Sequence, residues 1–165
     1  MIIVFDSSTL ILLAKTDLLR EVLAEVEIII SQEVQAECLA KKTADAELIS
    51  LLVQEGRINV RKTIDAKAIK QLQMDFRIAK AEAESLWLAR KHQYPIAIDD
   101  GPGIKASKVL GLQFLTAVHF LLRLASRNIL SPELAQEKLT TLVQYGRYSK
   151  RIIEDAMSRL QEGRK

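Results

Sequence analysis

The chain has 165 residues, of which 48% are hydrophobic and 27% are charged, and this length fits one domain with a continuous core. Its 24 Lys and Arg exceed its 21 Asp and Glu by a small margin, which permits an anionic partner without requiring one. Cys38 is the single cysteine, so an internal disulfide and a cysteine-rich zinc site are excluded, and two histidines leave soft metals without ligands. A bound metal ion would therefore have oxygen ligands.

The apolar start of the chain does not have the pattern of an export signal. Asp6 interrupts it, no basic segment precedes it, and no apolar run reaches the roughly 20 residues that cross a membrane. We therefore expect a protein of the reducing cytoplasm that has no membrane partner.

The first half of the chain alternates short apolar runs with helical patterns. Runs rich in β-branched residues at 2–5 and 27–30 are each followed by apolar residues at helical spacing, the first helix reaching about residue 19. Ser31 suits the N-terminal cap of the second helix. A third helix is predicted at about 45–55, ending at Gly56, and a half-exposed strand at about 57–63.

The second half continues this alternation and then becomes helical. Helices are predicted at about 65–73 and 79–91, strands at 94–98 and 113–115, and between these strands a helix to about Leu110. From residue 117 the tail is helical, with a new helix starting at Ser131-Pro132 and a stop at Gly146. The apolar segment 118–125 suits either the core or a dimer face, and we favour the core.

Strands that alternate with helices predict a three-layer α/β/α fold with a central, mostly parallel sheet. We expect a single domain over 1–165, with its core at about 1–120 and a helical C-terminal tail at about 117–165. In such sheets ligands bind at the carboxyl ends of the strands. Asp6 and Asp99 each follow an apolar run, so both are placed at that edge.

Each acid also has an ordinary structural interpretation. Asp6 suits a helix cap as well as a functional site, and the residues alone leave the two equal. The adjacent carboxylates of Asp99 and Asp100 repel unless a cation or hydrogen-bond donors offset them, although turns rich in Gly and Pro often carry exposed Asp. Glu82 and Glu84 point about 200° apart on a helix, so only one of them faces a given site.

Four short motifs, taken in order, resemble the PIN-domain family, specifically its small stand-alone prokaryotic branch related to toxin ribonucleases of toxin–antitoxin systems. They are Asp6-Ser7-Ser8-Thr9-Leu10-Ile11, Val34-Gln35-Ala36-Glu37, Ala81-Glu82-Ala83-Glu84-Ser85-Leu86, and Asp99-Asp100 followed by Leu110-Gly111-Leu112. There are two departures from the family pattern. Ala81 replaces a glycine, and Ile104 stands where many relatives carry Arg, with Lys105 as the nearest substitute.

The resemblance implies an endoribonuclease that depends on Mg²⁺ or Mn²⁺, because carboxylates suit hard divalent ions that stabilise a phosphodiester under attack. It implies Asp6, Glu84 and Asp99 as metal ligands, with Glu37 and Asp100 completing the five catalytic acids and Ser8 as a supporting hydroxyl. In this assignment Glu84 faces the site and Glu82 lies at the rim. The implied partners are RNA in preference to single-stranded DNA, a separately encoded antitoxin and a second copy of the chain.

Three other functions were weighed against this one. A catalytically silent PIN fold that serves as a protein-binding or assembly module has no need for several uncompensated carboxylates. A phosphatase of the haloacid-dehalogenase type needs a second Asp where this chain has Ser8. A phospho-receiver domain carries its acid pair near the start of the chain, whereas here the pair is at Asp99 and Asp100.

Overall fold

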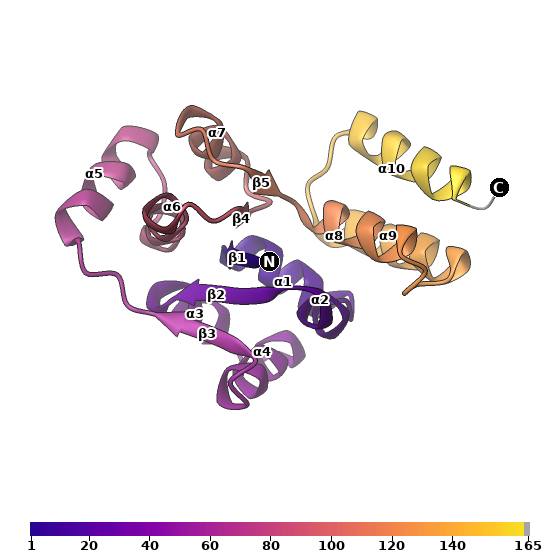
Figure 1. Ribbon diagram of the computed structural model, residues 1–165, viewed down its shortest axis with the longest axis horizontal. Helices are drawn as coiled ribbons and strands as arrows, with labels where there is room; N and C mark the ends of the chain where they lie inside the picture. The colour runs from indigo at the N-terminus through magenta and orange to yellow at the C-terminus, as the bar shows by residue number, and fades with distance from the viewer. Residues whose placement is uncertain (164–165) are drawn as a thin grey trace.

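The computed structural model describes residues 1–163 and is built on a five-stranded sheet in which all neighbouring strands are parallel (Figure 1). The strands are β1 (Ile2–Phe5), β2 (Glu27–Ser31), β3 (Ile58–Arg61), β4 (Ile96–Ala97) and β5 (Phe114–Leu115). Their order in the sheet is β3-β2-β1-β4-β5. The chain adds β2 and β3 on one side of β1 and then adds β4 and β5 on the opposite side of β1. The strand order therefore switches between β1 and β4, and ligands of such sheets bind at such a switch.

Ten helices connect and flank these strands within the described residues. They are α1 (Ser7–Lys15), α2 (Leu19–Glu25), α3 (Gln32–Leu39), α4 (Ala44–Gln54), α5 (Ala66–Phe76), α6 (Lys80–His92), α7 (Gly101–Val109), α8 (Ala117–Ser126), α9 (Pro132–Tyr145) and α10 (Lys150–Glu162). The single first helix expected from the sequence is divided into α1 and α2. Asp17, with a φ of 54°, adopts the left-handed conformation at the break, which apolar spacing alone does not reveal.

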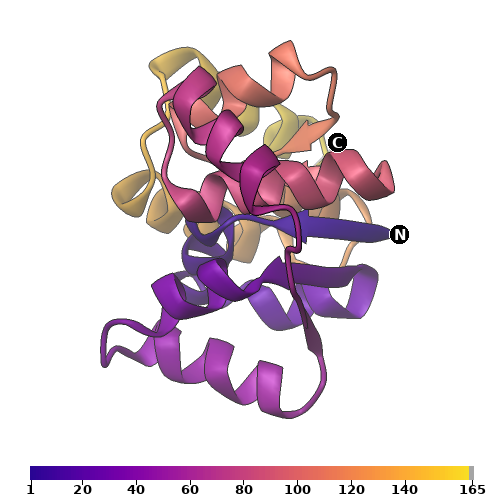
Figure 2. The ribbon, with the colours of Figure 1, turned by 90° about the vertical axis from the view of Figure 1, so that its left-hand side faces the viewer.

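Helices cover both faces of the sheet, as Figure 2 shows. Alternate residues of the strands point to opposite faces, so Ile3 and Phe5 join one core and Val4 joins the other. The first core also contains apolar residues of α1, α3, α4 and α8, and the second contains those of α5, α6 and α7. This is the three-layer arrangement expected from the sequence.

The C-terminal tail consists of α8, α9 and α10 (Figure 1). Ser131 caps α9 and Pro132 opens it, while Gly146 closes it, as the sequence predicts. Phe120, Leu121 and Leu124 of α8 are buried in the first core, and the Phe120 ring stacks on Phe5 with centroids 5.3 Å apart. The core position favoured for segment 118–125 is therefore confirmed.

Among the described helices, none is long and apolar enough to cross a membrane.

Candidate active site

Asp6 directly follows β1 and caps α1. Its Oδ2 accepts hydrogen bonds from the Ser8 hydroxyl at 2.8 Å and from the Ser8 backbone N–H at 3.3 Å. Its Oδ1 is buried and has no hydrogen-bond partner among the residues that the structure describes. Burial raises the pKa of Asp6 to about 6, and the nearby charge of Glu37 adds to this effect. One oxygen therefore caps the helix, while the other is left for a ligand.

Ser8 connects Asp6 to the end of the neighbouring strand. Its Oγ donates to Asp6 and accepts the backbone N–H of Asp99 at 3.0 Å. The pairing of β1 with β4 makes this possible, because the Asp6 N–H donates to the carbonyl of Ala97 at 2.9 Å. Ser8 thus fixes the Asp6 carboxylate relative to the end of β4.

Asp99 is held by three donors from distant segments. Its Oδ1 accepts the Thr9 hydroxyl at 2.6 Å and the Ala117 N–H at 2.9 Å, and its Oδ2 accepts the Tyr148 hydroxyl. Burial raises the pKa of Asp99, and these hydrogen bonds oppose the rise. Both carboxylate oxygens are thus engaged by the protein itself, which suits a residue that fixes the end of β4.

Glu84 is similarly engaged, on a different side of α6. Its Oε1 accepts the Thr63 hydroxyl at 2.9 Å and its Oε2 accepts the backbone N–H of Glu33 at 3.3 Å, and the residue is 5% exposed. Because Glu33 lies in the first turn of α3, the carboxylate of Glu84 satisfies one of the free donors at that helix end. Glu84 therefore joins α6 to α3 and to the segment after β3.

Glu82, two residues before Glu84, is half-buried and lies within electrostatic range of the other acids. Burial raises its pKa to about 7, and the charges of Asp100, Asp6 and Glu37 raise it further, while a hydrogen bond from the Ala79 backbone opposes them. The family register places Glu84 toward the acids and Glu82 at the rim; in the structure both carboxylate oxygens of Glu84 accept hydrogen bonds from the protein, whereas Glu82 lies within range of the charges of the other acids.

The reason for this difference lies in the burial of α6. Ala81, Ala83, Glu84, Ser85 and Leu86 are all buried, so the helix is covered on nearly every side. Such a helix has no distinct apolar stripe from which its rotation can be predicted. The charges of Asp100, Asp6 and Glu37 act on Glu82, and apolar periodicity does not predict this.

Asp6, Glu37, Glu82 and Asp100 together form what we term the acid group. They come from the ends of β1 and β4 and from helices α3 and α6. The thiol of Cys38 is affected by two of these carboxylates. Burial raises its pKa to about 12, and the negative charges of Glu37 and Asp6 contribute to the rise. The carboxylates of Asp6, Glu37 and Asp100, from segments far apart in sequence, thus lie within electrostatic range of Glu82, near the switch in strand order.

A family model described as a PIN domain matches residues 2–162. The chain belongs to the PIN-domain family. PIN domains are in general nucleases and typically bind divalent metal ions. None of the curated proteins compared matches this PIN domain.

The donor chemistry of this PIN domain fits a hard divalent ion. All four acid-group residues offer oxygen, and the unpartnered Oδ1 of Asp6 is a buried acceptor without a donor. Among the described residues, no three His, Cys, Asp or Glu side chains lie close enough together to hold a metal ion by themselves. Mg²⁺ is commonly bound through one or two carboxylates and retains several waters, so this spacing is compatible with such a shell.

Several supporting residues of this PIN domain could not be found from the sequence. Thr9 lies within a motif but had no assigned role, and Tyr148 is 49 residues from the Asp99 that it contacts. At the position of the missing family Arg, Ile104 packs partly buried against the second core, and Lys105 is exposed. No local signal marks these long-range contacts.

Proposed function

We propose that the chain is an endoribonuclease that uses Mg²⁺ or Mn²⁺ held at the acid group. The single observation that carries this proposal is the buried Oδ1 of Asp6, which has no hydrogen-bond partner among the described residues and lies within electrostatic range of Glu82. A buried acceptor without a donor, surrounded by like charges, is stabilised by a cation. This favours a metal-dependent nuclease over a silent binding module.

The acids divide into metal-holding and supporting roles in this proposal. Asp6 would hold the ion, and Ser8 fixes the orientation of the Asp6 carboxylate. Glu82, Glu37 and Asp100 complete the site directly or through water, and Asp99 positions Asp100 by anchoring the end of β4. The ion, when bound, offsets the negative charge that grows on the phosphodiester oxygens.

A proton must also leave the attacking water. Glu82 and Asp100 are each partly exposed, in contrast to Asp6, which is 1% exposed. Glu37 is exposed, so water reaches the acid group at Glu37, Glu82 and Asp100, and a carboxylate there is suited to accept the proton. Because metal binding requires ionised carboxylates, we expect the proton on Glu82 to be released when the ion binds.

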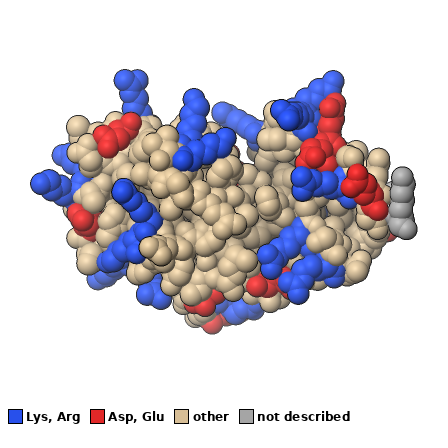
Figure 3. All heavy atoms as spheres, turned by 45° about the horizontal axis from the view of Figure 1, so that its top comes forward, with Lys and Arg blue, Asp and Glu red and all other residues tan. Residues whose placement is uncertain are grey.

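Basic side chains near this half of the molecule support an anionic polymer as substrate. Lys and Arg predominate on the left-hand part of the surface in Figure 3. Helices α5, α6 and α7 lie in this part of the molecule (Figure 1). The exposed basic residues of these helices and their connections are Lys67, Lys70, Arg77, Lys80, Arg90, Lys91, Lys105 and Lys108. Such residues neutralise phosphates without reading sequence.

The family resemblance extends the proposal to biological context. We propose RNA in preference to single-stranded DNA, a cytoplasmic location, and action as the toxin of a toxin–antitoxin pair with a separately encoded antitoxin. A homodimer is the proposed assembly.

Cleavage of a mixed, end-labelled RNA preparation with Mn²⁺ tests the proposed activity. The wild-type protein is expected to cleave it and to stop when EDTA is added. Asp6→Asn should lose at least about 100-fold in rate, as expected when a catalytic electrostatic group is removed. Glu47→Gln, on the exposed side of α4, is the matched control and should retain activity. Persistent cleavage in excess EDTA, or full activity of Asp6→Asn, would refute the proposal; a folded protein without cleavage would favour the silent binding module.

A further inference from the structure

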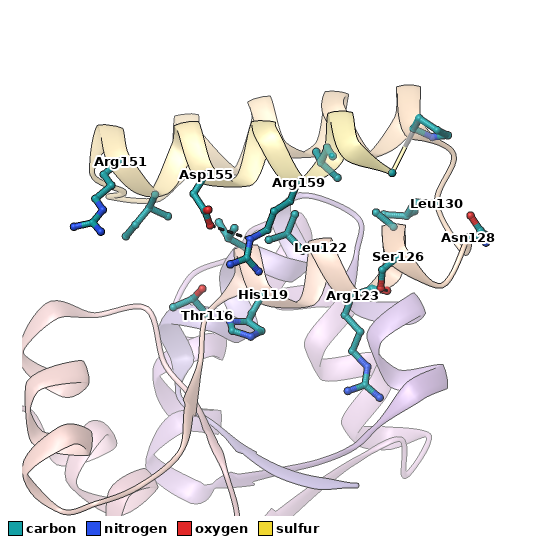
Figure 4. Close-up of a pocket in the computed structure, with 16 residues that line it drawn as sticks. Thr116, His119, Leu122, Arg123, Ser126, Asn128, Leu130, Arg151, Asp155 and Arg159 are labelled. Carbon is teal, nitrogen blue, oxygen red and sulfur yellow. Dashed lines mark hydrogen bonds and ion pairs between the residues drawn. The ribbon is translucent and has the colours of Figure 1, made fainter. Parts of the chain in front are cut away.

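A groove separate from the acid group lies between α8, the start of α9 and α10 (Figure 4). Its volume is about 830 Å³. None of its lining residues in the described part of the chain belongs to the acid group. The groove therefore requires its own explanation.

The floor of the groove is apolar. It is formed by Val118 and Leu122 from α8, Leu130 from the connection to α9, and Ile152 and Leu160 from α10. Ile152 is 46% exposed, so part of this apolar lining faces solvent. An apolar surface of this kind is stabilised when a partner covers it.

The rim of the groove is basic. Arg123, Arg151 and Arg159 line it, together with a single acid, Asp155, whose carboxylate is 3.1 Å from the Arg159 guanidinium. In Figure 4 Asp155 and Arg159 extend from α10 toward α8. Three guanidinium groups against one carboxylate leave a net positive rim, which is complementary to acidic side chains.

The combination favours a peptide over a nucleic acid. No Phe, Tyr or Trp is present among the described lining residues, whereas single-stranded nucleic acids bind on such rings. An apolar floor between basic rims matches a helix with an apolar stripe and acidic flanks. The groove runs along α10, whose 13 residues correspond to about 20 Å, enough for about three to four turns of a bound helix.

We infer that this groove binds an amphipathic helix of a protein partner, with an apolar stripe in the groove and Glu or Asp residues toward Arg123, Arg151 and Arg159. Arg is suited to this role because its guanidinium pairs with carboxylates in a bidentate manner. This inference is independent of the nuclease proposal, since it uses none of the acid-group residues.

The test uses a synthetic, fluorescein-labelled helical peptide of about 14 residues with Leu at positions i, i+3, i+4 and i+7 and Glu on its flanks. One control peptide replaces every Glu with Lys, and a second has the same composition in scrambled order. Fluorescence anisotropy with the full chain measures each affinity. The Glu peptide is expected to bind at least about tenfold more tightly than either control.

Protein variants then locate the binding surface. Ile152→Asp places a charge on the exposed floor residue and should weaken binding by at least about tenfold. The double variant Arg123→Glu, Arg151→Glu should lose the Glu peptide and gain the Lys peptide, which shows that the protein remains folded. Arg20→Glu on α2, an exposed residue that does not line the groove, is the matched control and should bind as wild type.

Three outcomes would overturn the inference. The first is equal binding of the Glu and Lys peptides, or no binding of either. The second is wild-type affinity in Ile152→Asp. The third is loss of binding to a labelled single-stranded RNA, rather than to the peptide, in the Arg123→Glu, Arg151→Glu variant, because this would assign the groove to nucleic acid.

Discussion

The hydroxyl group of Tyr148 donates a hydrogen bond to Oδ2 of Asp99, 49 residues earlier in the chain. Tyr148 lies in the connection between α9 and α10, so the C-terminal tail contributes directly to the support of the candidate site. Gly146 allows this approach, because a Cβ atom there would lie 2.4 Å from the Tyr148 ring. The tail is thus a structural part of the site and not a separate appendage.

Removal of this hydroxyl tests its contribution to stability. Tyr148→Phe keeps the ring but leaves a carboxylate oxygen of Asp99 without its donor, so the free energy of unfolding should fall by about 1–3 kcal/mol. Urea unfolding measures the change. Tyr145→Phe is the control, since Tyr145 is 55% exposed and should change the stability little. If the two variants were equally stable, the Tyr148–Asp99 bond would have no energetic role.

The two glutamates of α6 should separate stability from site chemistry. The buried Glu84 carboxylate accepts hydrogen bonds from the Thr63 hydroxyl and the Glu33 backbone N–H. Glu84→Gln replaces one of these acceptor oxygens with an amide group and should lower the free energy of unfolding by about 1–2 kcal/mol. Glu82→Gln removes a charge that is repelled by Asp100, Asp6 and Glu37, so the metal-free protein should be as stable or more stable. Urea unfolding at about pH 8 in EDTA makes the comparison. The reverse order of stabilities would show that α6 is rotated from the position described.

The metal-free protein should become less stable as the pH rises. The folded-state pKa values of Asp6, about 6, and Glu82, about 7, exceed the ordinary values of 3.8 and 4.5. Between the ordinary and folded values the folded protein holds more protons than the unfolded chain, so the free energy of unfolding falls with rising pH over about pH 4–7. Asp6, which is 1% exposed, contributes on the order of 3 kcal/mol to this fall.

Urea unfolding in EDTA at several pH values measures this dependence. Wild-type protein should be more stable at about pH 5.5 than at about pH 8, and the slope should be smaller in Asp6→Asn and in Glu82→Gln. An unchanged slope in both variants would show that these carboxylates have ordinary pKa values.

Much of the fold was predictable because its signals are local. The β-branched runs before Asp6 and Ser31 correctly predicted β1 and β2, and Ser131-Pro132 correctly predicted the start of α9. β4 is shorter than predicted, with Ile96 and Ala97 alone in strand geometry out of the run 94–98. The PIN family was correctly inferred from motifs that lie in the expected order.

The details of the site were less accessible from the sequence. The spacing of Glu82 and Glu84 showed that only one faces the other acids, but a helix buried on nearly all sides leaves the choice open. The Tyr148–Asp99 bond depends on how the tail folds back, which no short-range pattern encodes. The family order of acids therefore points to a region of the fold, whereas the individual contacts depend on tertiary structure.

A melting series against Mn²⁺, with wild type, Glu82→Gln and Glu84→Gln side by side, tests most directly the claim that the acid group containing Glu82 holds a divalent ion. Because the ion binds only the folded site, saturating Mn²⁺ should raise the wild-type melting temperature by about 5 °C or more. Glu84→Gln should start from a lower melting temperature and keep most of this increment, while Glu82→Gln should lose at least about half of it. An increment in Glu82→Gln equal to that of wild type, or its loss in Glu84→Gln alone, would contradict the account.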